Sequence, residues 1–478
     1  MRIEDYAMIG DTQTSALVGR DGSIDWLCLP RFDSGACFAS LLGDRSNGRW
    51  KLAPRGEGHS VRRRYLPGTL VLETEYTTPE GVVRVTDCMP IRTKAPDVVR
   101  LVEGVSGAVS MSMDLVVRFD FGSTVPWVQN RDGILSLVAG PDALELFSGV
   151  EVHGEDMSTS ASFTVRPGDR VPFVLTWHPS VEEAPQRTDP ATAIVSTVAW
   201  WRAWSERCSG GGRWEKELQS SLIVLKALTY SPTGGIVAAP STSLPEAIGG
   251  GRNWDYRYCW LRDATFTLQV LLWAGYGREA VEWRDWLLRA IAGDPSQIQI
   301  MYGLGGERRL PELELDWLKG YEGSQPVRIG NGAARQRQLD VYGEVLDSMY
   351  QARRSGLSPE PEAWHVEKAL LDWLESGWRE PDSGLWEMRG EPRHFVHSKV
   401  MSWVAFDRAV RTVEQFGTEG NLEHWRAMRD EIHGEVCERG WDSERSTFTQ
   451  SYGSKELDAS LLMIPMVGFL PPGDPRVG

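Results

Sequence analysis

The chain has 478 residues, 41% of them hydrophobic and 24% charged, which is the composition of an ordinary globular protein with room for more than one domain. A formal net charge of −15 argues against nucleic acid or an anionic membrane surface as the main partner, whereas a neutral substrate would be indifferent to it. The six cysteines are scattered, without a CxxC pair or a histidine at ligand spacing. Neither a disulfide scaffold nor a metal site is therefore expected.

The N-terminal part is predicted to consist of strands. Apolar and polar residues alternate, as in a half-buried strand, over 70–76, 111–119 and 171–177. Residues 15–18 and 23–27 flank a glycine-bounded turn and predict a hairpin. Many short strands with turn signals between them favour an antiparallel β-sandwich over residues 1–185.

The pattern changes at about residues 180–190, where three prolines and few aliphatic residues indicate a linker. Residues 192–208 predict a connecting helix rich in tryptophan, and we assign 186–212 to the linker. From there on the apolar period is helical, which predicts an all-α domain over 213–478. The helices expected in it span 215–230, 263–273, 278–292, 338–353, 363–378, 399–415 and 422–437.

Residues 249–263 form the first segment that suggests a site. Three glycines precede a run of aromatic and charged residues, and Asp263 is predicted to be the N-cap of the helix that follows. Trp260, Arg262 and Asp263 suit a sugar, because an indole stacks on the ring while ionic groups share hydrogen bonds with hydroxyls. The alternative is a capped core helix in which Arg262 and Asp263 pair. A phosphate cradle is disfavoured, since no Lys-Ser or Lys-Thr follows the glycines.

Two further segments carry candidate residues. The loops 231–262 and 293–336 are too long for simple connections, and the second contains Trp317, Arg328 and several acids. Solvated surface charge would explain most of those acids. Trp386 and Glu387 lie in a glycine-bounded turn, where an apolar indole would desolvate the carboxyl and raise its pKa, as a general acid requires. The alternative is a helix-terminating loop with an exposed glutamate.

Taken together, these segments resemble family 15 of the glycoside hydrolases, in particular bacterial glucoamylases, glucodextranases and trehalases. Residues 16–34 are similar to the trehalase-type N-terminal domain, 253–263 to the sugar-binding signature and 384–387 to the general-acid turn. The resemblance implies a β-sandwich followed by an (α/α)6 barrel. It also implies site roles: Glu387 as general acid, Arg262 and Asp263 holding glucose hydroxyls, Trp260, Trp317 and Trp386 as cleft walls, and Arg328 in a substrate-contacting loop.

The implied activity is inverting hydrolysis of α-glucosidic bonds with release of glucose, without a cofactor or metal. The substrate would be a neutral α-glucoside, and the sequence does not separate trehalose from α-glucan oligosaccharides, nor does it fix an oligomeric state. Two alternatives remain open at this point: a non-catalytic carbohydrate-binding or regulatory relative, and a phosphorylase that uses phosphate in place of the catalytic base.

The sequence departs from the family in two places. Met388 follows the predicted acid, where fungal glucoamylases have a second glutamate. The chain also offers fewer helices than the family's barrel and no candidate for the catalytic base, which the family has as a glutamate near the barrel's last helices. We therefore expect the barrel to be incomplete at its C-terminus, in either a fragment or a degraded relative. On that expectation the chain alone would hydrolyse glucosides slowly or not at all, and it would be poorly soluble or oligomeric because of exposed apolar flanks. The N-terminus lacks a signal-peptide core and 461–470 is too short to span a bilayer, which predicts a cytoplasmic protein.

Overall fold

The computed structural model describes residues 1–357 and 361–477. The chain forms two compact units. The first unit comprises residues 1–232, 237–258 and 312–330, and the second comprises 233–236, 259–311 and the chain from 331 onward. The two long loops that the sequence singled out therefore contribute residues to both units.

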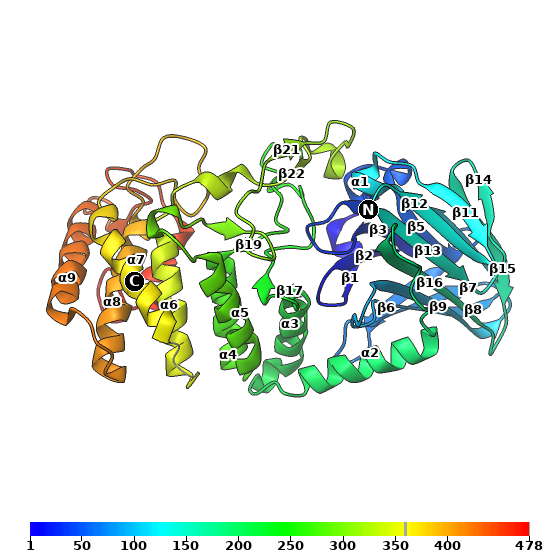
Figure 1. Ribbon diagram of the computed structural model, residues 1–478, viewed down its shortest axis with the longest axis horizontal. Helices are drawn as coiled ribbons and strands as arrows, with labels where there is room; N and C mark the ends of the chain where they lie inside the picture. Colours follow the sequence, from blue (N-terminus) through cyan, green and yellow to red (C-terminus); the bar gives the residue numbers. More distant parts are fainter. Residues whose placement is uncertain (358–360, 478) are drawn as a thin grey trace. The chain divides into compact units, whose positions relative to one another are not determined.

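Two antiparallel sheets make up most of the first unit (Figure 1, blue to cyan). The strands of the first sheet are β1 (Tyr6–Gly10), β2 (Ser15–Gly19), β3 (Ser23–Cys28), β4 (Ala36–Phe38), β5 (Arg49–Pro54), β10 (Val109–Val116), β14 (His153–Glu155) and β15 (Ser158–Val165). Those of the second sheet are β6 (Ser60–Tyr65), β7 (Leu72–Thr78), β8 (Gly81–Cys88), β9 (Asp97–Gly107), β11 (Trp127–Arg131), β12 (Ile134–Ala139), β13 (Asp142–Ser148) and β16 (Arg170–Pro179). The first sheet runs β1-β2-β3-β5-β10-β15-β14, with β4 on β3, and the second runs β11-β12-β13-β16-β9-β8-β7-β6.

Period-two alternation builds the core between these sheets. In β10, Met111, Met113 and Leu115 are buried, whereas Ser110 on the opposite face is exposed. Each inward side chain meets others from both sheets in one apolar cluster. The predicted antiparallel β-sandwich is thereby confirmed.

The hairpin of β2 and β3 is confirmed as well, and one strand prediction is too long. Ala16 pairs with Leu27, and the connecting turn contains Gly22 at a φ of 82°, a conformation that glycine adopts without strain. The strand predicted over 111–119 ends at Val116. Phe119–Gly122 (α1) instead forms a tight turn in which Asp120 and Phe121 have φ of 47° and 56°.

Helix α2 (Pro190–Ser205) follows the sandwich and packs on its second sheet. The Asp189 side chain accepts a hydrogen bond from the Thr192 amide, and Pro190 supplies a first-turn residue that needs no N–H partner. On the inner face of the helix, Ala193 packs against Val99 and Val174 of the sheet. The tryptophan-rich helix expected from the sequence is therefore present.

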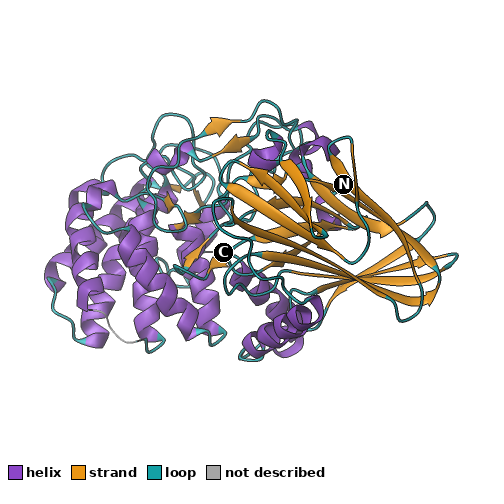
Figure 2. Ribbon diagram, turned by 45° about the vertical axis from the view of Figure 1, so that its right-hand side comes forward, coloured by secondary structure: helices purple, strands orange, loops and turns teal. Residues whose placement is uncertain are grey.

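The helices predicted after the linker are present (Figure 2), whereas a helical domain over 213–478 stays a prediction. The remaining helices are α3 (Glu215–Ala227) in the first unit and α4 (Leu261–Trp273), α5 (Gly277–Ala290), α6 (Asp340–Arg354), α7 (Pro361–Gly377), α8 (Val396–Phe416), α9 (Leu422–Arg439) and α10 (Met463–Met466) in the second. Helix α4 packs on α5 and α6, and α8 packs on α6 and α9. In α5, Ala280, Trp283 and Leu287 form the buried stripe expected of an amphipathic helix.

Short strands lie in the segments between and after the helices. They are β17 (Thr229–Tyr230), β18 (Gly235–Ile236), β19 (Cys259–Trp260), β20 (Met301–Tyr302), β21 (Leu313–Glu314), β22 (Arg328–Ile329), β23 (Trp441–Asp442) and β24 (Thr447–Phe448). The helix predicted over 215–230 stops at Ala227 because the chain becomes extended at β17. No helix in the described part of the chain is long and apolar enough to cross a membrane, and the cytoplasmic location stays a prediction.

All six cysteines are free thiols. Cys28, Cys37, Cys88 and Cys259 are buried, whereas Cys208 in the first unit and Cys437 in the second are partly exposed. Burial raises the pKa of the Cys28 thiol to about 11 and raises those of Cys37 and Cys88 as well.

Candidate active site

The turn that carries Glu387 has an unusual backbone. Gly384 and Glu387 both lie in the left-handed region, with φ of 66° and 54°. At Gly384 a side chain is excluded, because a Cβ atom would come within 2.7 Å of the Phe395 ring. A non-glycine residue in this region costs free energy, and such residues concentrate at functional sites. The fold thus imposes a specific backbone conformation on Glu387.

The Glu387 carboxyl is partly buried, and its surroundings favour the protonated form. Desolvation is the main influence and raises the pKa of this carboxyl, as does the nearby charge of Asp263. Three neighbours act in the opposite sense: the indole N–H of Trp260, which donates to Glu387 Oε1 at 2.6 Å, and the positive charges of Arg262 and Arg389. The net shift is upward, which is what a general acid working near neutral pH requires.

Trp260 is placed by a short strand. It ends β19, which pairs with β20 through Trp260 and Met301, and it has an extended backbone with φ of −74° and ψ of 133°. Helix α4 begins directly afterwards at Leu261. The prediction that Asp263 is the N-cap is therefore wrong, because Trp260 takes that position and Asp263 lies in the first helical turn. A carboxylate there is still favoured by the helix dipole.

Arg262 is bound by side chains at the start of helix α6 and just before it. Its guanidinium donates to Asp340 Oδ2 at 2.9 Å and to Gln338 Oε1 at 3.2 Å, and 12% of its side chain is exposed. Asp340 is fully buried, and Glu344, one helical turn later, is buried as well. Desolvation raises the pKa of the Glu344 carboxyl well above its ordinary value. Arg262 thus forms its ion pair with Asp340. The alternative in which Arg262 simply pairs with Asp263 does not explain how the Arg262 side chain is held.

Asp263 faces solvent beside this pair. Solvent reaches its side chain, yet the surrounding protein removes enough water to raise the pKa of the carboxyl, against the lowering effect of Arg262. Asp263 and Arg262 also influence the Glu387 carboxyl by charge. Three of the predicted site residues, together with Trp260, therefore lie close enough to interact.

Trp386 and its neighbours complete this part of the second unit. The indole is 47% exposed, and its N–H donates to the carboxylate of Asp458. Met388, where a glutamate was expected from fungal relatives, is exposed and contributes its backbone carbonyl as acceptor for Gln336 Nε2 at 3.2 Å.

Trp317 and Arg328 belong to the first unit, and their polar groups are engaged there. The Trp317 indole N–H donates to the carbonyl of Phe121 at 3.0 Å. Arg328 donates to the Gly251 carbonyl at 2.9 Å and pairs with Glu314 at 3.2 Å. Their contact with a substrate stays a prediction.

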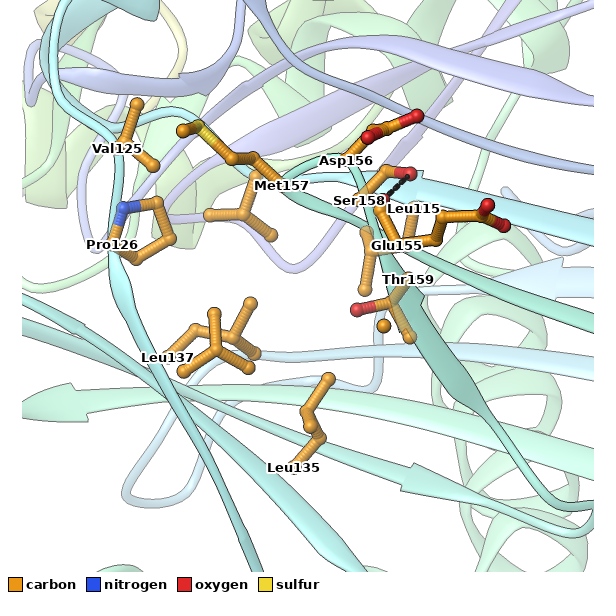
Figure 3. A pocket seen from close by; sticks show the side chains of 13 residues that line it. Leu115, Val125, Pro126, Leu135, Leu137, Glu155, Asp156, Met157, Ser158 and Thr159 are labelled. Carbon is orange, nitrogen blue, oxygen red and sulfur yellow. Dashed lines mark hydrogen bonds between the residues drawn. The ribbon is translucent and has the colours of Figure 1, made fainter.

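The first unit also contains a pocket, which is apolar and so differs from the polar cluster around Glu387. It has a volume of about 310 Å³, and aliphatic side chains such as Leu115, Leu135 and Leu137 line it between the two sheets, with Met157 at its edge (Figure 3). None of the predicted site residues lines it. Among the residues that the structure describes, no group of three His, Cys, Asp or Glu side chains is arranged to hold a metal ion.

Comparison with sequence families separates the two parts of the chain. The model described as "Trehalase-like, N-terminal" matches residues 1–193, and that described as "Glycosyl hydrolases family 15" matches residues 212–477. The chain belongs to glycosyl hydrolase family 15. It is therefore a glycoside hydrolase, as the resemblance of its motifs predicted.

Known relatives of this family 15 hydrolase bear enzyme names. A trehalase from Mycobacterium tuberculosis is 40% identical over 511 residues, which cover 99% of this chain and 74% of the relative. A trehalase from Thermoplasma volcanium is 33% identical over 483 residues, covering 99% of this chain and 77% of the relative. These names give no support to the alternative of a non-catalytic binding protein.

A solved bacterial glucoamylase, in complex with acarbose, has the same fold. It aligns with a TM-score of 0.71 and 12% identity, covering 100% of this chain and 77% of the glucoamylase. The order of sandwich and helical domain in this family 15 hydrolase is thus that of the glucoamylase-like fold.

Three polar residues around Arg262 were missed in the sequence. Gln338, Asp340 and Glu344 are buried around Arg262. A signal was present, because Asp340 and Glu344 are four residues apart on a helix whose neighbouring positions are largely apolar. Acids at that spacing share one helical face, and a buried acidic face needs a cationic partner.

Proposed function

We propose that this chain takes part in hydrolysis of the α-glucosidic bond of trehalose with inversion, a reaction that needs a general acid and a general base, and that its residues supply the general acid. Glu387 protonates the leaving oxygen, Arg262 and Asp263 hold hydroxyls of the innermost glucose, and Trp386 presents its exposed indole to the sugar. Trp317 and Arg328 are proposed as further substrate contacts, within a catalytic domain that follows a sandwich and a linker over 186–212. The observation that carries the proposal is the Glu387 carboxyl, whose pKa is raised by desolvation while Trp260 fixes its orientation.

The names of the relatives favour trehalose over maltose or isomaltose as the substrate of this chain. Such a substrate is uncharged, so the net charge of −15 neither attracts nor repels it. The residues assigned to the sugar combine ionic hydrogen-bonding groups with an indole face, which suits a polyhydroxylated ring.

The test is glucose release from trehalose, maltose and isomaltose by the wild type and by Glu387→Gln. Loss of the proton donor should lower kcat on trehalose by about 10²–10⁴-fold. Glu391→Gln is the matched control, because Glu391 is exposed on the same loop and should leave kcat unchanged. Full activity of Glu387→Gln would refute the assigned acid, and faster release from maltose than from trehalose would refute the substrate.

Stereochemistry gives a second readout. Inversion at one anomeric carbon of α,α-trehalose yields one β-glucose, while the departing half is released as α-glucose. Proton NMR during the first minutes should therefore show both anomers in equal amounts. Retention would release α-glucose alone and would contradict the inverting mechanism.

A further inference from the structure

The indole N–H of Trp386 is hydrogen-bonded to Asp458, which lies 72 residues later in the sequence. The indole N–H lies 2.9 Å from Asp458 Oδ2 and 3.0 Å from Asp458 Oδ1, so the N–H is shared between the two carboxylate oxygens. The ring is otherwise largely open to solvent, with 47% of the residue exposed. An exposed tryptophan in a turn samples several rotamers unless something holds its polar edge.

Asp458 is itself fixed by three donors. The Ser460 amide donates to Oδ1 at 2.8 Å, and Gln450 Nε2 donates to Oδ2 at 3.0 Å, in addition to the Trp386 indole. Partial burial alone would raise the pKa of this carboxyl, but these hydrogen bonds hold it below its ordinary value. The group is therefore an ionised acceptor at neutral pH, and hydrogen bonds to a charged acceptor are about twice as strong as neutral ones.

The position of Trp386 in the chain links this contact to the acid. Trp386 directly precedes Glu387, whose φ of 54° is set by the turn from Ser383 to Met388. A rotation of the Trp386 ring about its side-chain bonds would move the large exposed apolar surface that directly precedes the acid in the chain. A ring held by its N–H instead presents the same face at all times, which lowers the entropy lost when a sugar stacks on it.

We propose that Asp458 is a positioning residue that holds the Trp386 indole as a rigid stacking surface beside Glu387. The inference rests on the proposed function, because it gives Trp386 a sugar to contact. The competing explanation is that Asp458 only caps the short helical turn Ala459–Leu462, because its side chain also accepts a hydrogen bond from the Ser460 amide.

A double-mutant cycle separates the two explanations. We compare wild type, Asp458→Ala, Trp386→Phe and the double variant by kcat and KM on trehalose. Asp458→Ala should lower kcat/KM by about 10-fold, in line with the loss of a charge-assisted hydrogen bond. In the Trp386→Phe background, where no indole N–H remains, the same substitution should have little effect. An equal loss in both backgrounds would show that Asp458 acts as a cap alone and would overturn the proposal.

The conservative variant provides the matched control. Asp458→Asn keeps one acceptor oxygen, which can serve the indole and the Ser460 amide, and loses the acceptor for Gln450 Nε2 and the negative charge, so part of the lost kcat/KM should return. Thermal melting of every variant identifies losses that come from unfolding. If Asp458→Asn is as impaired as Asp458→Ala although both remain folded, the hydrogen bond to Trp386 is not the property that matters.

An activity-independent readout keeps this inference separate from the proposed function. With ¹⁵N-labelled tryptophan, the Trp386 indole signal is the one missing from Trp386→Phe. The hydrogen exchange of this indole N–H should be slow in the wild type and faster in Asp458→Ala. Added glucose should shift the indole signal only in proteins that keep the hydrogen bond between Trp386 and Asp458. A wild type that binds glucose but hydrolyses none of the glucosides contradicts the proposed function alone. An indole whose exchange and glucose response are the same in Asp458→Ala contradicts the positioning role.

Discussion

Two buried arginines show how differently the two units use charge. Arg100, inside the sandwich, is fully buried and donates to Asp87, to the Trp50 carbonyl and to the Gly22 carbonyl, each at 2.8 Å. Its guanidinium also lies 5.2 Å from the centre of the Trp50 ring. Protein acceptors therefore engage Nε and both terminal nitrogens of this guanidinium, although the Trp50 indole N–H and the Tyr76 hydroxyl beside it are buried without a hydrogen-bond partner.

Arg262, in the second unit, has fewer hydrogen-bond partners than Arg100, and several polar atoms around it lack a partner. Within the described residues, Asp340 Oδ1 and Glu344 Oε1 are buried without a hydrogen-bond partner, and so is Nδ1 of His397 on α8. Desolvation shifts the pKa of Glu344 upward and that of His397 downward. Buried groups with unmet hydrogen-bonding capacity and shifted pKa values are typical of functional sites. Around Arg262 the unmet hydrogen-bonding capacity thus falls on carboxyl and imidazole groups, whereas around Arg100 it falls on an indole and a phenol.

The largest effect that tests this comparison is expected at Arg100. Arg100→Met leaves Asp87 buried without a counter-charge and should lower the free energy of unfolding by about 3–5 kcal/mol. The kcat of the molecules that remain folded should not change. Urea unfolding and active-site-normalised kinetics measure the two quantities. Arg170→Met is the control, because the pair of Arg170 with Glu103 is exposed and should be worth less than about 1 kcal/mol.

The second prediction concerns Arg262, where activity rather than stability should suffer most. Arg262→Met removes charge-assisted hydrogen bonds to the sugar and should lower kcat/KM on trehalose by about 10–100-fold. Arg278→Met, on the exposed face of α5, should leave kcat/KM as it is. If folded Arg262→Met retains wild-type kcat/KM, Arg262 is as purely structural as Arg100, and the contrast between the two units disappears.

The smallest effect sharpens the comparison through pH. The Trp260 N–H stabilises the ionised form of Glu387, so Trp260→Phe should raise the pKa of that carboxyl further. The acid works in its protonated form, and the alkaline limb of the kcat/KM profile should therefore move upward, by about 0.5–1 pH unit. Trp273→Phe, at an exposed position of α4, is the control and should leave the profile in place. A limb that stays put, or moves to lower pH, would contradict this account of Glu387.

The fold was largely predictable because its signals are local. The β2–β3 hairpin follows from alternation around a turn with Gly22, and the stripe of Ala280, Trp283 and Leu287 follows from helical spacing. The error at Asp263 shows the limit of such signals, since aspartate is favoured both at the N-cap and in the first turn. Only the pairing of β19 with β20, which keeps Trp260 extended, decides between them.

The residues of the candidate site could be proposed from the sequence, but the contacts of their side chains could not. Trp260, Arg262 and Glu387 could be proposed from their motifs, whereas the partners Asp340 and Asp458 lie 78 and 72 residues away from the side chains that they bind. Such pairs depend on how helices and loops pack, and sequence periodicity carries no information about that. The resemblance to the family placed Trp317 and Arg328 near a substrate, and the structure shows only how the first unit holds them.

The distribution of the thiols has a practical consequence for spectroscopy. Maleimide reagents react with thiolates that solvent can reach, which excludes the four buried cysteines. Cys208 and Cys437 remain, one on each unit. Because burial and Glu215 raise the pKa of the Cys208 thiol, coupling is best done at mildly alkaline pH. A donor and an acceptor dye, or two spin labels, can thus be attached to the native sequence, and the distance between them reports the arrangement of the two units in solution.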